Sequence, residues 1–186
     1  VEVSTTVGCD FGLSGITTIN AILRIDQNGF VDINSPNYGT ASTLIYNNSP
    51  AGYKRNKEWN TDVPGANRTG YPHNVIVQNS TPLQLNSTDF PAAPALGCSG
   101  NFTINTGSSI ITTDMANPLS VNGNLTIAGT LTLSTNAAGV LNVGGNWART
   151  GTFVQNDRNV NFNGSGNGIL TATGGQTFTF MTMSKT

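Results

Sequence analysis

Charged residues are scarce in this chain: only 17 of its 186 residues are Asp, Glu, Lys or Arg, and the formal net charge is −1. Eight basic residues do not provide the positive surface that nucleic-acid binding or a basic membrane patch requires. No apolar run approaches the roughly 18 residues of a membrane-spanning helix, so membrane insertion is not expected. The start, Val1-Glu2-Val3, has no signal-peptide pattern, and we expect a mature or excised segment.

Cysteine and histidine are rarer still, with two and one copies respectively. Cys9 and Cys98 each follow a glycine. They can form one long-range disulfide if their strands lie side by side, or act as two small buried hydrophobic residues. There is no C-x-x-C motif, and His73 is far from both cysteines, so the sequence predicts no zinc site, no other metal and no cofactor.

Neutral polar residues take the place of charge: the chain has 26 Thr, 25 Asn, 22 Gly and 14 Ser. Twelve of the 17 charges lie in residues 1–89, and the rest of the chain carries only Asp114, Arg149, Asp157, Arg158 and Lys185. Hydrophobic residues make up 37% of the chain, which is enough for one elongated core.

A Gly-Asn-apolar unit repeats at intervals of 23 and then 22 residues, at Gly100-Asn101-Phe102, Gly123-Asn124-Leu125 and Gly145-Asn146-Trp147. Upstream, Asn74-Val75-Ile76-Val77 followed by Leu83-Gln84-Leu85 resembles Asn124–Ile127 followed by Leu131–Leu133. Apolar residues alternate within each unit, which is the pattern of a strand with one buried face. The period is longer than the 8 to 12 residues between the strands of a sandwich.

The repeat therefore predicts an all-β fold, a right-handed parallel β-helix (β-solenoid) whose coils stack on one another. In this fold Asn74, Asn101, Asn124 and Asn146 are corner or stacking residues rather than ligand-binding ones. We expect glycine and asparagine there because both tolerate a positive φ. Phe102, Leu125 and Trp147 occupy equivalent places and are expected to form one inward stack.

The rest of the chain divides around this solenoid. Residues 1–40 are expected to be an irregular amino-terminal coil or cap, with a hairpin turn at Asn28-Gly29 between two apolar runs. Residues 41–186 form the solenoid, interrupted by a loop excursion at 47–73. The last coil, from Phe178, stops unfinished at Thr186, so more chain or a second copy is expected to cover it.

Several segments resemble the β-solenoid parts of very large secreted or cell-surface proteins of the Bacteroidetes, particularly flavobacteria. The resemblance covers roughly residues 40–186 and depends on Thr43–Tyr46, Glu58-Trp59, Gly70–Val75, Leu125–Leu133, Gly144–Trp147 and Val160–Gly164. It implies an extracellular or cell-surface location reached by type 9 secretion, and an adhesin-like role.

The excursion at 47–73 concentrates the aromatic and charged side chains of an otherwise neutral chain. Loops on a rigid scaffold commonly carry recognition, so Tyr53, Arg55, Glu58, Trp59, Tyr71 and His73 are candidate glycan-binding residues. The alternative is that Trp59 and Tyr71 fold down over the solenoid and Arg55 pairs with Glu58, because a loop this long needs a small core of its own.

Three other activities have weaker motifs. Asp26–Asp32 places carboxylates around a turn, as calcium ligands require, but it lacks the full calcium-loop spacing and is better interpreted as a solvated hairpin turn. No nucleophile elbow or H-E-x-x-H motif occurs, so an enzyme is not expected. Thr-x-Thr pairs such as Thr130/Thr132 resemble ice-binding faces but do not recur at the coil period.

Taken together, these features predict a structural and adhesive extracellular module. It would be a stiff rod that is part of a giant surface adhesin or stacks end to end into a filament. The alternative function is a carbohydrate-binding module that uses the loop at 47–73.

Overall fold

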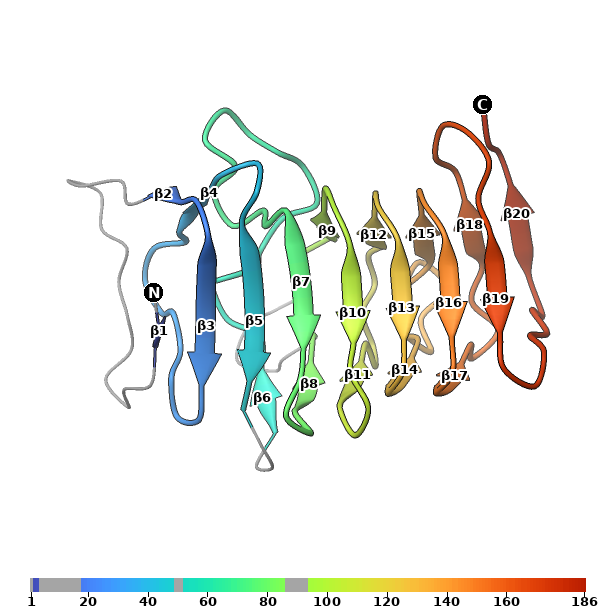
Figure 1. The fold of residues 1–186 in the computed structure, drawn as a ribbon, viewed down its shortest axis with the longest axis horizontal. Helices are drawn as coiled ribbons and strands as arrows, with labels where there is room; N and C mark the ends of the chain where they lie inside the picture. Colours follow the sequence, from blue (N-terminus) through green and yellow to red (C-terminus); the bar gives the residue numbers. More distant parts are fainter. Residues whose placement is uncertain (1, 4–17, 49–51, 86–93) are drawn as a thin grey trace.

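The computed structural model describes residues 2–3, 18–48, 52–85 and 94–186. Within these ranges the chain is an all-β, right-handed parallel β-solenoid of about 7 turns (Figure 1). The predicted fold class is confirmed. No helix in the described ranges is long and apolar enough to cross a membrane.

The largest sheet has eight strands in the order β1-β3-β5-β7-β10-β13-β16-β19 and faces the viewer in Figure 1. We call it the front sheet. Its strands are β1 (Glu2–Val3), β3 (Ile22–Asp26), β5 (Thr43–Asn47), β7 (Asn74–Val77), β10 (Phe102–Ile104), β13 (Leu125–Ile127), β16 (Trp147–Arg149) and β19 (Leu170–Ala172).

Two five-stranded sheets complete the coils. The lower sheet contains β6 (Tyr53–Lys54), β8 (Pro82–Gln84), β11 (Ser109–Ile111), β14 (Thr130–Thr132) and β17 (Thr152–Val154). The rear sheet contains β9 (Leu96–Cys98), β12 (Leu119–Val121), β15 (Leu141–Val143), β18 (Val160–Phe162) and β20 (Met181–Met183). A separate pair joins β2 (Thr18–Ile19) to β4 (Asn37–Tyr38).

The winding direction can be followed in Figure 1. The chain runs down the front sheet in β10, passes through β11 at the bottom, and returns upward behind in β12 before entering β13. In this view each coil lies to the right of the coil before it. The winding is therefore right-handed, which is the usual hand of a parallel crossover.

The core consists of columns of side chains stacked in register. All pairs between the named strands are parallel, and Leu44, Val75, Phe102, Leu125 and Trp147 are aligned on successive front strands. Each is fully buried. The alternating apolar residues thus point inward, and burial of this area supplies the main stabilisation of sheets that no helix in the described ranges covers.

Part of the segment at 1–40 is an ordinary coil. Strand β3 pairs with β5 over five residues, from Ile22↔Thr43 to Asp26↔Asn47. Asn28 has a φ of 68°, and the Gly29 amide donates to the Asp26 carbonyl at 2.9 Å, so the turn exists. The hairpin prediction is wrong, because β3 pairs only with parallel neighbours and the turn is a corner of the solenoid. Residues 4–17 lie outside the described residues.

Candidate functional site

The four predicted asparagines form a hydrogen-bonded column that runs along the solenoid at the amino-terminal ends of the front-sheet strands. The Oδ1 atom of Asn74 accepts from the Asn101 amide at 2.9 Å, Asn101 accepts from Asn124 at 2.9 Å, and Asn124 accepts from Asn146 at 2.8 Å. Asn146 then accepts from the Ile169 amide at 2.8 Å, and the column ends there. Each side chain therefore joins its own coil to the next.

The glycine before Asn101, Asn124 and Asn146 is required for space rather than for backbone conformation. A Cβ atom on Gly145 would lie 2.5 Å from Asn124 Oδ1, and one on Gly100 would lie equally close to Asn74 Oδ1. Neither the glycines nor the asparagines of the repeat are among the described residues with a positive φ. The expected reason for the Gly-Asn pair is thus wrong, and the asparagine of the preceding coil supplies the correct one.

The excursion at 47–73 turns its largest side chains into the solenoid. Trp59 is fully buried, its Nε1 donates to the Gly97 carbonyl at 2.8 Å, and its ring meets Phe102 edge-on at 5.6 Å. The Gly97 amide also donates to the Thr61 carbonyl. The segment around Trp59 therefore runs beside β9 and completes a coil that has no rear strand.

Glu58 is the centre of a buried polar cluster in this segment. Its carboxylate accepts from Tyr46 Oη at 3.0 Å, Tyr53 Oη at 3.3 Å and the Asn56 amide at 2.9 Å. Tyr38 Oη donates to the Glu58 carbonyl. Burial raises the pKa of Glu58 even though the hydrogen bonds from the Asn56 amide and the Tyr46 hydroxyl oppose the rise. The same burial raises the pKa of Tyr38, Tyr46 and Tyr53.

Arg55 is also buried, but it makes no direct ion pair with Glu58. Its guanidinium donates to the carbonyls of Leu85 and Trp59 at 3.0 and 2.6 Å, and burial lowers its pKa. The Nη2 atom is buried without a hydrogen-bond partner among the described residues. The alternative prediction was therefore correct that the aromatic residues fold inward, but wrong about an Arg55–Glu58 pair.

These positions bear directly on the predicted glycan-contacting loop. Tyr53, Arg55, Glu58, Trp59 and Tyr71 are each 8% exposed or less. Tyr53, Trp59 and Tyr71 could stack on a sugar ring only through an open aromatic face, and these faces are covered by the protein itself. The loop residues therefore build the core of the excursion and do not form a contact surface in this structure.

His73 is the exception, because it is half-buried at the molecular surface. Its Nδ1 lies 2.8 Å from Ser99 Oγ, which also accepts from Arg68 Nη2 at 2.6 Å. Desolvation and the Arg68 charge lower the pKa of His73, which favours a neutral ring that accepts the Ser99 proton. No carboxylate among the described residues bonds the other ring nitrogen, so the group ties the excursion to β9 without forming a catalytic triad.

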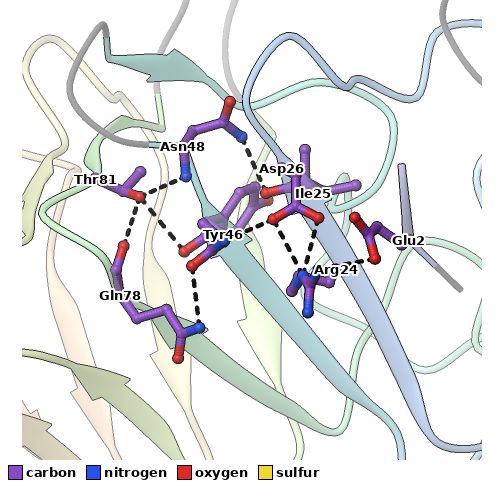
Figure 2. A network of polar contacts seen from close by, with 9 residues as sticks. Glu2, Arg24, Ile25, Asp26, Tyr46, Asn48, Gln78 and Thr81 are labelled. Atoms are coloured by element: carbon purple, nitrogen blue, oxygen red, sulfur yellow. Dashed lines mark hydrogen bonds and ion pairs between the residues drawn. The ribbon is translucent and has the colours of Figure 1, made fainter. Parts of the chain in front are cut away.

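Asp26 lies in a network of polar contacts with Arg24 and Asn47 (Figure 2). Arg24 Nε approaches its carboxylate at 2.9 Å and Asn47 Nδ2 donates at 2.6 Å. Burial acts against them, but these hydrogen bonds lower the pKa of Asp26. The Glu2 carboxylate forms an ion pair with Arg24, with Oε2 2.8 Å from Nη2. In the described part of the chain no three His, Cys, Asp or Glu residues are grouped to hold a metal.

Near Asp26, further hydrogen bonds connect the coils that contain β3, β5 and β7. Gln78 Nε2 donates to Asn47 Oδ1, while the Thr81 hydroxyl accepts from the Asn48 amide (Figure 2). Asn48 Nδ2 donates back to the Ile25 carbonyl at 3.0 Å. The network therefore plays a structural role and stacks β3, β5 and β7 in register.

Cys98 is fully buried at the end of β9 and has no disulfide partner among the described residues, and burial raises the pKa of its thiol to about 12. It is therefore an unreactive core residue in this structure. Cys9 lies outside the described residues, so the Cys9–Cys98 disulfide stays a prediction.

The carboxyl-terminal coil is the part of the described surface where apolar side chains gather. Leu170 is 45%, Met181 48% and Met183 62% exposed. They pair in register with the buried residues Trp147, Val160 and Phe162 of the coil before. The last coil therefore presents the continuation of the core columns to solvent, and β17, β19 and β20 are the terminal strands of their sheets.

Below this surface lies an aromatic cluster that the sequence reasoning missed. Phe178 contacts Trp147, Phe162 and Phe153 with ring centroids 5.4, 5.8 and 6.2 Å apart. Gln155 holds the same segment, since its Oε1 accepts from the Thr179 amide and its Nε2 donates to the Phe180 carbonyl. The sequence feature that could have predicted this cluster is the recurrence of Phe at 153, 162, 178 and 180 after Trp147.

Comparison with known proteins found no matching family model, no similar curated protein and no similar solved structure.

Proposed function

We propose that the protein is a structural module of an extracellular rod, in which a further β-coil packs on the carboxyl-terminal coil. One observation carries this proposal: Leu170, Met181 and Met183 extend the core columns but are covered by nothing in the described structure. A coil placed there would bury these side chains, at about 25 cal/mol per Å² of apolar surface. It would also pair the open edges of β19 and β20, the terminal strands of the front and rear sheets.

The links between the coils suit a load-bearing element. Parallel backbone ladders join each coil to the next, and from β7 to β19 the asparagine column adds a side-chain link. Such a stack depends on neighbour contacts alone and can be extended without changing its geometry. The location outside the cell, the type 9 secretion route and an adhesive role are part of the proposal, and they rest on the resemblance to solenoid segments of the Bacteroidetes.

Electron microscopy of the purified protein at rising concentration tests the stacking. We expect rods that lengthen with concentration, or single particles whose natural polypeptide continues as one longer rod. Met183→Glu places a charge on the end surface and should abolish concentration-dependent growth. Val63→Glu is the matched control, because Val63 is equally exposed, at 60%, but lies in the excursion.

Single particles at every concentration, together with a natural polypeptide that forms no continuous rod, would contradict the proposal. Equal growth of the Met183→Glu and wild-type particles would show that copies stack through another surface.

A further inference from the structure

The outer face of the front sheet between β7 and β19 is a second surface with a regular chemistry. Its central outward column is formed by Ile76, Thr103, Thr126, Ala148 and Thr171, aligned in register. None of these residues is ionisable. Figure 1 shows that no drawn segment crosses in front of these strands. We call this surface, together with the flanking asparagine column, the front face.

The asparagine column adds hydrogen-bond donors to the front face. The Oδ1 atoms of Asn101, Asn124 and Asn146 are occupied by amides of the next coil. Their Nδ2 groups have no partner among the described residues, and Asn101 and Asn124 are exposed. Neighbouring strands lie about 4.8 Å apart. The front face therefore offers one free amide donor per coil, beside the hydroxyls of Thr103 and Thr126.

This chemistry selects among partner classes. A face without charge has no Coulomb attraction for nucleic acids or acidic polysaccharides. The residues that contribute most to protein interfaces are enriched in aromatic and arginine side chains, and the outward residues named above include neither. A linear polymer that repeats hydroxyl groups matches donors and hydroxyls that repeat at every coil.

We propose that the front face binds a neutral, linear polysaccharide laid along the solenoid axis. The amide groups of Asn101, Asn124 and Asn146 donate to its hydroxyls, and the small side chains of Thr126 and Ala148 let the sugar rings approach the sheet. The asparagines are already held by the coils, so binding orders few side chains and each weak contact costs little entropy. This inference does not depend on whether coils stack end to end.

Retention on insoluble polysaccharides tests the front face. The probes are microcrystalline cellulose and chitin, with calcium alginate gel as the acidic comparison. We expect the wild type to be retained on at least one neutral polymer and not on alginate. Thr126→Lys, a bulky charge at the centre of the front face, should lower retention at least tenfold.

Thr132→Lys is the matched control, because Thr132 belongs to the same coil and is also half-buried, but on β14 of the lower sheet. It should bind as the wild type does. Asn124→Asp is a second variant that keeps an oxygen for the Asn146 amide but removes the free donor. It should weaken retention while circular dichroism remains unchanged.

Four outcomes would overturn the inference. They are no retention of the wild type on either neutral polymer, equal retention on alginate, and equal losses for Thr126→Lys and Thr132→Lys. The fourth is arrest of ice growth without polysaccharide retention, which would assign the face to ice.

Discussion

At the scale of single residues, the Gly-Asn pair explains how one coil recognises the next. The asparagine oxygen reaches a backbone amide of the following coil, and the glycine before that amide leaves the room that the side chain occupies. A residue with a Cβ atom at Gly145 would displace Asn124 and break this contact. The asparagine of one coil and the glycine of the next coil therefore act together.

Asn124→Ala should lower the free energy of unfolding by about 1 kcal/mol, because the Asn146 amide loses its acceptor. Asn167→Ala is the control, since Asn167 is exposed in the Gly-rich corner after β18 and should change little. Urea titration of the two variants measures the difference, and equal midpoints would contradict the role of the column.

Glu58→Gln should remove a pH dependence of stability. The folded state raises the pKa of Glu58, so it binds more protons than the unfolded chain between the ordinary and the raised pKa. Wild-type stability should therefore fall as the pH rises through this interval, and the variant should lack that slope.

Unfolding midpoints in urea from about pH 4 to pH 8 test this difference. Asp26 has the opposite sign: its pKa is lowered, so its contribution to stability is lost as the pH falls. That contribution is common to both proteins and cancels in the comparison. Parallel pH curves for the wild type and the variant would show that Glu58 does not titrate in this way.

At the scale of elements, the last coil differs from those before it. The segment between β19 and β20 takes the place of a lower strand, so its position depends on side chains instead of a backbone ladder. Phe178 packs into the aromatic cluster around Trp147, while Gln155 holds the neighbouring backbone. These contacts decide whether β20 stays on β18.

Phe178→Ala should destabilise the last coil by about 2 to 3 kcal/mol, less than for a fully buried ring, because the Phe178 side chain is only partly buried. Limited proteolysis followed by mass spectrometry should then show faster cleavage within 170–186. Phe180→Ala is the control, since Phe180 is 54% exposed in the same segment. Equal cleavage of both variants would contradict a special role for Phe178.

At the scale of the whole molecule, the solenoid is a one-dimensional stack in which each coil is stabilised by its two neighbours. The central strands β10 and β13 have a strand on either side, whereas β19 and β20 are the terminal strands of their sheets. Stability should therefore decrease toward the carboxyl end, and any added coil should restore it.

Hydrogen exchange of the wild type measures this gradient directly. From β10 to the carboxyl end, we expect the slowest amide exchange in β10 and β13, and the fastest, among the front and rear strands, in β19 and β20. Uniform protection along the chain would contradict independent neighbour stacking and would indicate one cooperative unit. Protection of β19 and β20 that rises with protein concentration would support end-to-end association.

The sequence by itself determined the coils from Gly100 to Arg149. There every coil repeats the same neighbour contacts, so the period and the alternation of apolar residues contain the parallel stacking and the inward column of Phe102, Leu125 and Trp147. Local pattern was sufficient because each coil meets only its neighbours. It also marked the corner at Asn28-Gly29, although turn residues alone do not say whether the next strand pairs antiparallel or parallel.

Only the tertiary structure decided the direction of the excursion and the reason for the repeat glycines. Trp59 is buried because it meets Gly97, 38 residues away, and Arg55 because it meets Leu85, 30 residues away. No period in the sequence encodes such contacts. The glycines are small because an asparagine one coil earlier occupies their Cβ position, a steric demand that exists only once the coils are stacked.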